Sequence, residues 1–248
     1  MPLRLAILEA DTPVPAANER YGGYFGVFKH LFTRAVAPAP LESELILTGH
    51  DVVHNPSTAY PNLDDVDAIL ISGSKHNAFE DDEWILTLVE FARKALLHDR
   101  VKVVGICFGH QIVGRALGAL VARSDQGWEL SVVETRLTEK GKEVFGKERE
   151  TLNIQQMHRD QVFSVPPGAE VLASTDKCPN HGFIIPGRAI TVQGHPEFTE
   201  DIMGEILELR HELGLFTDDL YRSGKERNGD HHDGIFMAQV FLGFLQEQ

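Results

Sequence analysis

The 248-residue sequence has few cysteines and few basic residues, and each shortage excludes a class of protein. Cys107 and Cys178 are its two cysteines, too few for the disulfide framework of a small secreted domain. No window approaches the roughly 18 uninterrupted apolar residues of a membrane-spanning helix. Lys and Arg number 23 against 37 Asp and Glu, a net charge of −14. This charge opposes binding to nucleic-acid phosphates or to an anionic membrane surface.

The remaining composition is that of an ordinary globular protein. Hydrophobic residues make up 42% and charged residues 24%, which excludes a disordered chain. The first apolar run, Leu3–Leu8, is short and closes on Glu9 and Asp11, so it does not resemble a secretory signal. We therefore expect a cytoplasmic protein that meets a small molecule, with neither nucleic acid nor membrane as a partner.

Strands and helices alternate in the first half of the chain. Apolar runs predict strands at residues 3–8, 66–71 and 101–106, with a weaker one at 44–47. A helix is expected at 81–98, because apolar residues there recur at spacings of three and four. Two more are expected at 21–33, after a glycine-rich turn, and at 108–120, directly after a strand. This alternation is typical of a parallel α/β sheet. It predicts a three-layer, flavodoxin-like fold: a mostly parallel central sheet with helices on both faces.

The pattern changes after residue 120. Short strand-like pieces at 130–137, 151–156, 170–174, 182–185 and 189–193 are separated by turn residues, and we expect them to form a small antiparallel extension. Helices are predicted at 199–213 and 235–245. No repeat, low-complexity tract or linker interrupts the chain, so the prediction is one domain over residues 1–248.

The strongest local motif is Gly-Ile-Cys-Phe-Gly at residues 105–109, between a predicted strand and a predicted helix. A nucleophile on such a turn needs small flanking residues, because the chain is crowded there. The helix that follows directs its free N–H groups and its positive end toward the Cys107 sulfur, which favours the thiolate. The backbone N–H of Phe108 is then placed to bind a developing oxyanion.

A thiolate nucleophile requires a proton shuttle, and His195 is the candidate among twelve histidines. It lies in Gln-Gly-His-Pro-Glu-Phe, residues 193–198, directly after a predicted strand. Side chains at positions i and i+2 of an extended segment point the same way. Glu197 could therefore orient the far ring nitrogen of His195 while the near one faces Cys107. Pro196 between them fixes the backbone.

The motif around Cys107 and the later Gln-Gly-His-Pro-Glu-Phe resemble those of the class I glutamine amidotransferase family. The order Cys107, His195, Glu197 is the order of that family's triad. The resemblance implies that Gly73, in Leu-Ile-Ser-Gly-Ser, joins Phe108 in holding the oxyanion. It also implies that Gln111 contacts the bound glutamine or γ-glutamyl group. His158, in His-Arg-Asp, resembles a substrate-site segment of the glutaminase module of GMP synthetase.

The mechanism implied by the resemblance is acyl transfer through a γ-glutamyl thioester on Cys107. His195 protonates the leaving amine and then activates water, and Glu197 holds the His195 tautomer. No metal and no organic cofactor is required. Cys178, which precedes Pro179, has no part in this chemistry and is interpreted as structural or incidental.

Three functions are compatible with these residues. The segments 72–84 and 127–129 look like those of stand-alone γ-glutamyl peptidases of glutathione metabolism, and hydrolysis of glutathione-like or other γ-glutamyl conjugates is the favoured function. The first alternative is a glutaminase subunit that supplies ammonia to a separate synthetase. The second is an inactive binding or scaffold protein, which the intact Cys107, His195 and Glu197 disfavour.

Overall fold

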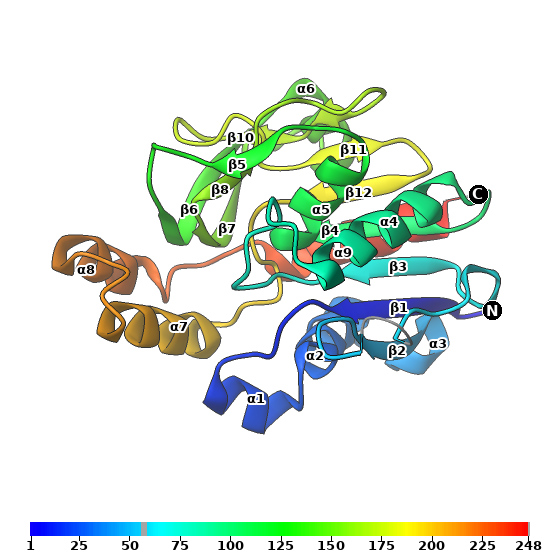
Figure 1. Cartoon of the computed structure of the whole chain (residues 1–248), viewed down its shortest axis with the longest axis horizontal. Helices are drawn as coiled ribbons and strands as arrows, with labels where there is room; N and C mark the ends of the chain where they lie inside the picture. Colours follow the sequence, from blue (N-terminus) through cyan, green and yellow to red (C-terminus); the bar gives the residue numbers. More distant parts are fainter. Residues whose placement is uncertain (56–58, 248) are drawn as a thin grey trace.

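The computed structural model describes residues 1–55 and 59–247, and its centre is a seven-stranded sheet (Figure 1). The strand order is β2-β1-β3-β4-β12-β11-β9. The first five strands are parallel, whereas β11 and β9 are antiparallel to their neighbours. The strands are β1 (Leu3–Glu9), β2 (Leu45–Asp51), β3 (Ala68–Ile71), β4 (Lys102–Ile106), β12 (Ala189–Val192), β11 (Phe183–Ile185) and β9 (Glu170–Val171). The five parallel strands have the flavodoxin-like 2-1-3-4-5 order, as expected from the sequence.

Helices cover both faces of this sheet and create two cores. Successive side chains of a strand point to opposite faces, so Leu5 and Ile7 of β1 pack in one core and Ala6 and Leu8 in the other. The first core includes α2 (Tyr24–Val36) and α9 (Gly234–Gln246). The second includes α4 (Glu83–Leu97) and α5 (Phe108–Ala116). The three-layer prediction is therefore confirmed.

Antiparallel strands form the extension predicted after residue 120. A three-stranded sheet has the order β10-β6-β7, with β10 at Ala173–Ser174, β6 at Glu129–Leu137 and β7 at Thr151–His158. β5 (Val121–Arg123) pairs with β8 (Asp160–Val162). The strand expected at 170–174 is divided in the structure, because β9 joins the central sheet and β10 joins β6.

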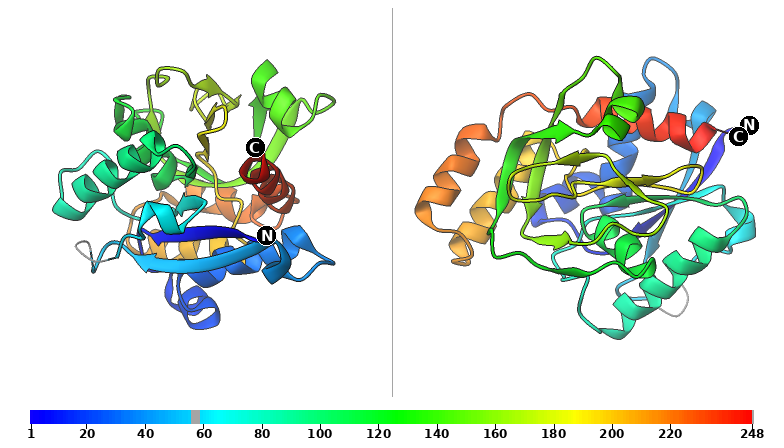
Figure 2. Two further views of the ribbon diagram at one scale, coloured as in Figure 1. Left: turned by 90° about the vertical axis from the view of Figure 1, so that its right-hand side faces the viewer. Right: turned by 90° about the horizontal axis from the view of Figure 1, so that it is seen from above.

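Several short helices complete the chain. They are α1 (Pro15–Tyr21), α3 (Leu41–Glu44), the 3₁₀ turn η1 (Leu63–Asp65), α6 (Glu139–Phe145), α7 (Glu200–Glu212) and α8 (Asp218–Arg227). Figure 2 shows α7 and α8 at the end of the molecule opposite the two termini. The helix predicted at 108–120 ends earlier, at Ala116. Within the described part of the chain, no helix is both long and apolar enough to cross a membrane. The prediction of a single domain, which includes the undescribed residues 56–58 and 248, stays a prediction.

Candidate active site

Cys107 lies at the tight turn between β4 and α5, at the edge where the parallel strands end. Its backbone φ of 51° and ψ of −102° are unusual for a residue other than glycine. A conformation of this kind costs on the order of 1–3 kcal/mol and persists where the surrounding structure enforces it. Here the Cys107 backbone N–H donates to the carbonyl of Val192, at 2.8 Å, which ties the turn to β12.

The two glycines of the motif are required by close approach of the backbone. A Cβ atom on Gly109 would lie 2.1 Å from the carbonyl oxygen of Ile71 in β3. One on Gly105 would lie 2.8 Å from the carbonyl oxygen of Gly109. Neither obstacle is a flexible side chain, so larger residues would open the turn. The expected need for small flanking residues is thus explained by the geometry.

His195 and Glu197 form a buried pair in the segment after β12. His195 Nδ1 lies 2.8 Å from Glu197 Oε1, and their side chains are 4% and 0% exposed. The His195 backbone N–H donates to the Gln155 carbonyl at 2.8 Å. The imidazole also stacks on Phe198, with ring centroids 4.0 Å apart. These contacts hold the ring in one orientation and direct Nδ1 toward the carboxylate.

His195 is close to Cys107, and Gly73 lies between β3 and both residues. A Cβ atom on Gly73 would lie 2.7 Å from His195 Cε1 and 3.8 Å from Cys107 Cβ. Burial lowers the pKa of His195, but the attraction of Cys107 and Glu197 outweighs it and raises that pKa to about 10. This environment therefore favours the imidazolium form of His195.

Two buried glutamines, Gln193 and Gln111, form a chain of hydrogen bonds that starts at Cys107. Gln193 Nε2 lies 3.4 Å from Cys107 Sγ, and Gln193 Oε1 accepts from Gln111 Nε2 at 3.1 Å. Gln111 also donates to the carbonyl of Asp160, at 3.0 Å. Sequence analysis selected Gln111 but missed Gln193. The available signal was its position two residues before His195.

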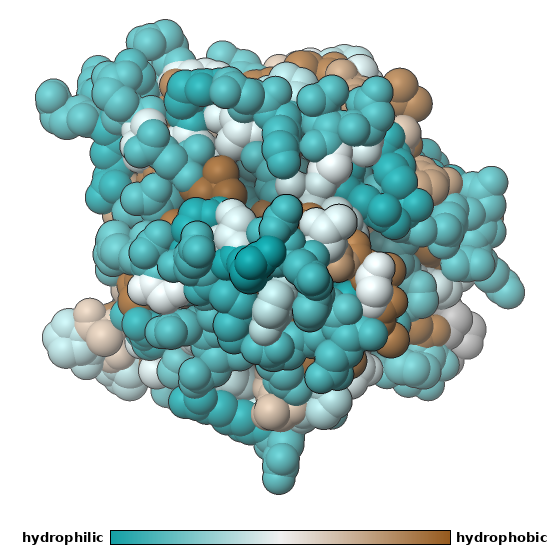
Figure 3. Space-filling model, turned by 90° about the vertical axis from the view of Figure 1, so that its left-hand side faces the viewer, coloured by the Kyte–Doolittle hydropathy of each residue, from teal (hydrophilic) through white to brown (hydrophobic). Residues whose placement is uncertain are grey.

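A cavity of about 660 Å³ opens beside Cys107. Cys107, Phe108, Gln111, His158 and His195 all line it, so the structure brings these predicted residues to one site. The face on which the parallel strands end is mostly hydrophilic, with smaller hydrophobic patches (Figure 3). Glu197 is not part of the lining and lies behind His195.

The cavity lining is basic, although the chain is acidic overall. It includes four basic side chains and only two carboxylates. The basic residues are Lys75, Arg123, Arg159 and Arg210, and the acidic ones are Asp11 and Asp160. Lys75 is paired with Asp11 at 2.8 Å, and Arg123 with Asp160 at 3.1 Å. Among the described residues, neither Arg159 nor Arg210 has an acidic partner within ion-pair distance.

Arg159 and Arg210 are both positioned by Trp128. Their guanidinium carbons lie 5.0 and 5.4 Å from the centroid of the Trp128 ring system. Burial lowers the pKa of Arg210, while Cys107, Tyr24 and Asp11 act in the opposite direction. Sequence analysis did not select either arginine, because helical periodicity gives no indication that Arg210 of α7 approaches the same Trp128 ring as Arg159. Two cations held without acidic partners in a cavity favour an anionic ligand.

His158 occupies a different environment from the other predicted residues. It lines the cavity, but its Nε2 lies 3.1 Å from Glu129 Oε2 and its Nδ1 3.3 Å from the Asp160 carbonyl. Its two ring nitrogens are therefore directed to residues other than Cys107.

Comparison with known proteins gives a consistent family assignment. The model of the family described as "Glutamine amidotransferase class-I" matches residues 25–210. A glutamine amidotransferase-like protein of Schizosaccharomyces pombe is 36% identical, over 100% of both chains. Gamma-glutamyl peptidase 4 of Arabidopsis thaliana is 34% identical over 94% of this chain and 91% of its own. A glutamine amidotransferase of Thermotoga maritima has a similar structure, with a TM-score of 0.76, 18% identity and 100% of both chains covered.

Proposed function

Since this chain belongs to the class I glutamine amidotransferase family, we propose that it hydrolyses γ-glutamyl amide bonds of small peptides. Cys107 is the nucleophile, His195 the acid and base, and Glu197 the residue that orients His195. The observation that carries this proposal is the arrangement of these three side chains beside a basic cavity. The relatives named gamma-glutamyl peptidases support the same bond type.

The reaction begins when the Cys107 thiolate attacks the γ-carbonyl carbon. The backbone N–H groups of Gly73 and Phe108 stabilise the oxyanion, and loss of one such donor typically costs about 10²–10³-fold in rate. The C–N bond then breaks, and His195 gives its proton to the leaving amine. The products of this half-reaction are the free amine and a γ-glutamyl thioester on Cys107.

Hydrolysis of the thioester returns the enzyme to its starting state. His195, now neutral, takes a proton from water as the water oxygen attacks the thioester carbon. The C–S bond breaks, glutamate leaves, and the thiolate and imidazolium are restored. Glu197 accepts the Nδ1 proton of His195 in a hydrogen bond throughout, which keeps Nε2 directed to the reacting atoms.

The two arginines without acidic partners favour a leaving group that carries a carboxylate. In this proposal Arg159 and Arg210 bind the C-terminal carboxylate of a γ-glutamyl peptide, as in glutathione. Glutamine has no carboxylate on its leaving side, because ammonia is its leaving group. The basic lining therefore favours a peptide over glutamine as the substrate.

A substrate panel tests this function. Purified protein is incubated with glutamine, glutathione, a glutathione S-conjugate and glutathione whose glycine is amidated, and products are resolved by mass. We expect release of the Cys-Gly portion from glutathione, and none from the variant Cys107→Ala. Wild-type turnover by Cys107→Ala would overturn the mechanism. Slow glutamine hydrolysis that accelerates when a synthetase is added would instead support the ammonia-supplying alternative.

The variant Arg210→Met tests recognition of the leaving group. A hydrogen bond to a charged group is worth about 1.5–3 kcal/mol, so kcat/KM for glutathione should fall about 10–100-fold. The amidated substrate should lose much less, since it lacks the carboxylate. Arg222→Met is the matched control, because Arg222 pairs with Asp219 in an exposed position on α8. Equal losses for both substrates would contradict the carboxylate assignment.

A further inference from the structure

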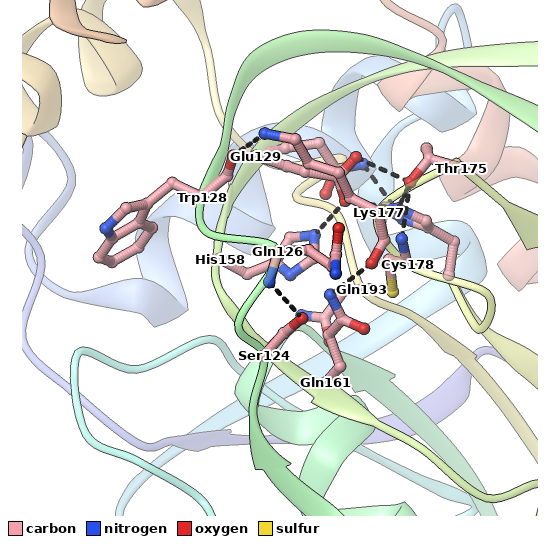
Figure 4. Close-up of polar contacts among 12 residues, drawn as sticks. Ser124, Gln126, Trp128, Glu129, His158, Gln161, Thr175, Lys177, Cys178 and Gln193 are labelled. Atoms are coloured by element: carbon pink, nitrogen blue, oxygen red, sulfur yellow. Dashed lines mark hydrogen bonds and ion pairs between the residues drawn. The ribbon is translucent and has the colours of Figure 1, made fainter.

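Four buried side chains that could bind a metal lie close together beside the substrate cavity, and one of them is His158, which also lines that cavity. Glu129 begins β6, His158 ends the paired strand β7, and Cys178 lies in the segment between β10 and β11 (Figure 4). His181 belongs to the same segment as Cys178. One potential ligand atom from each lies within 4.8 Å of the corresponding atom of every other. Glu129 Oε2 is 2.9 Å from His181 Nε2 and 3.1 Å from His158 Nε2.

Both ring nitrogens of His158 face groups that accept hydrogen bonds. His158 Nδ1 lies 3.3 Å from the Asp160 carbonyl, and Nε2 lies 3.1 Å from the Glu129 carboxylate. Within the described residues Nε2 has no hydrogen-bond partner of normal geometry, although His158 is 3% exposed. A metal ion bound between Nε2 and the carboxylate would provide the partner that Nε2 lacks.

The surrounding groups match the outer partners of a metal site. Histidine ligands usually donate their second ring N–H to a carbonyl or carboxylate, as His158 does to Asp160. His181 Nδ1 lies 3.5 Å from the Gln156 side-chain amide, whose oxygen has no partner among the described residues. Rotation of that amide would let it accept from His181 Nδ1–H and free Nε2 to bind a metal. Thr175 Oγ1 donates to Glu129 Oε1 at 2.8 Å and so orients the carboxylate.

We propose that Glu129, His158, Cys178 and His181 bind one Zn²⁺ in a closed, four-coordinate site. Cysteine, histidine and carboxylate are the ligands that Zn²⁺ takes in tetrahedral sites, at about 2.0–2.3 Å. Zn²⁺ displaces the Cys178 thiol proton, which leaves to solvent, and the thiolate and carboxylate then balance the two positive charges. All four positions are filled by the protein, so the ion is structural and enters no step of the proposed hydrolysis.

The proposed zinc would add a link between segments that hydrogen bonds already join. In the loop from Thr175 to His181, Lys177 Nζ donates to the carbonyl of Trp128, the residue before β6, at 2.9 Å. Gln161 Nε2 donates to the Lys177 carbonyl, also at 2.9 Å. A metal between Glu129 and Cys178 would fix this loop, and with it the strand start that carries Trp128 into the substrate cavity.

The test is a zinc titration of the full-length protein. Protein stripped with a chelator and dialysed is titrated with ZnCl₂ against a chromophoric chelator, and its thermal midpoint is followed. We expect one Zn²⁺ per chain and a midpoint that rises with zinc concentration. Co²⁺ in place of Zn²⁺ should give the near-ultraviolet thiolate-to-cobalt band of a tetrahedral cysteine site. Binding well below one ion per chain would overturn the proposal.

Variants of the two cysteines test whether the metal binds at Cys178 rather than at the nucleophile Cys107. Cys178→Ser should abolish the cobalt band and weaken zinc binding by at least about 10–100-fold, the loss typical of damage even to an outer partner. Cys107→Ser is the matched control and should keep both signals. His181→Asn provides a second ligand variant if Cys178→Ser does not fold. Zinc affinity equal to that of the parent in a folded ligand variant would also overturn the assignment.

Discussion

The two cysteines of this chain have similar neighbours but differ in their access to the substrate cavity. Each lies close to histidine and glutamate, and each is buried. Cys107 lines a cavity of about 660 Å³, whereas Cys178 is 0% exposed and does not line that cavity. The comparison shows that residue type alone does not separate a candidate nucleophile from a candidate ligand. What separates them is whether the cysteine lines a cavity large enough to hold a substrate.

The electrostatic environments of the two cysteines also differ. At the first, the attraction of Cys107 and Glu197 overcomes burial and raises the pKa of His195 to about 10. At the second, burial raises the pKa of the Cys178 thiol to about 12. A thiol of this kind is inert as a nucleophile and becomes a thiolate only when a cation replaces its proton.

The largest expected difference between the regions is in turnover. Cys107→Ala should lower γ-glutamyl hydrolysis by about 10⁴-fold or more, because no other group can form the thioester. The variant should remain folded, with a measurable thermal transition, since the substitution removes one sulfur beside an open cavity. Product release measured by mass spectrometry gives the rate, and calorimetry gives the midpoint. A variant that retains more than a few per cent of turnover would show that the two cysteines do not differ in this way.

The two glutamates provide the next comparison. Glu197→Gln should lower kcat by about 10²–10⁴-fold, because the amide can stabilise the wrong tautomer of His195. Glu129→Gln should instead destabilise the fold, by about 1–3 kcal/mol, because an amide cannot accept both hydrogen bonds that the buried carboxylate forms with Thr175 and His181. Urea unfolding and steady-state kinetics on both variants measure the two effects. The comparison fails if Glu197→Gln costs as much stability as Glu129→Gln.

Alkaline pH should act on the first region through His195. Its folded pKa is raised above the ordinary value, so its contribution to stability is complete below about pH 6.5 and is lost progressively as pH rises through about 10. Cys107→Ala removes the electrostatic attraction of Cys107 for the His195 imidazolium, so the pKa of His195 should fall. The loss of stability at high pH should then become smaller. Imidazole NMR and urea unfolding at both ends of this range provide the test. An unchanged His195 titration in the variant would show that Cys107 does not raise this pKa.

Sequence patterns were sufficient for the parallel sheet and for the turn at Cys107. The apolar runs of β1, β3 and β4 are buried on both faces of the sheet, so their positions are determined by hydrophobicity alone. The His195–Glu197 pair could also be anticipated, because both residues lie in one extended segment. Contacts formed within a few residues are those that a local pattern encodes.

The parts that escaped prediction depend on contacts between distant segments. Arg159 and Arg210 meet on Trp128 from a turn after β7 and from α7. Glu129 and His158 meet because β6 pairs with β7, and Cys178, 49 residues after Glu129, follows β10, which also pairs with β6. The short strands β5 and β8 have only three residues each, too few for a period to be recognised. No pattern of residue spacing within a short segment predicts contacts between segments so far apart in the sequence.

The smallest expected effect concerns the orientation of the Glu129 carboxylate. The Thr175 hydroxyl donates to Glu129 Oε1 at 2.8 Å and accepts from the Cys178 backbone N–H at 3.0 Å. Thr175→Val removes both hydrogen bonds and keeps the volume, so the fold should lose about 1–3 kcal/mol. For a chain of this size the thermal midpoint should then fall by about 2–10 °C. The zinc-loaded protein should show a smaller decrease than the stripped protein, because the ion holds the carboxylate independently. Equal decreases with and without zinc would mean that Thr175 supports the loop rather than the ligand.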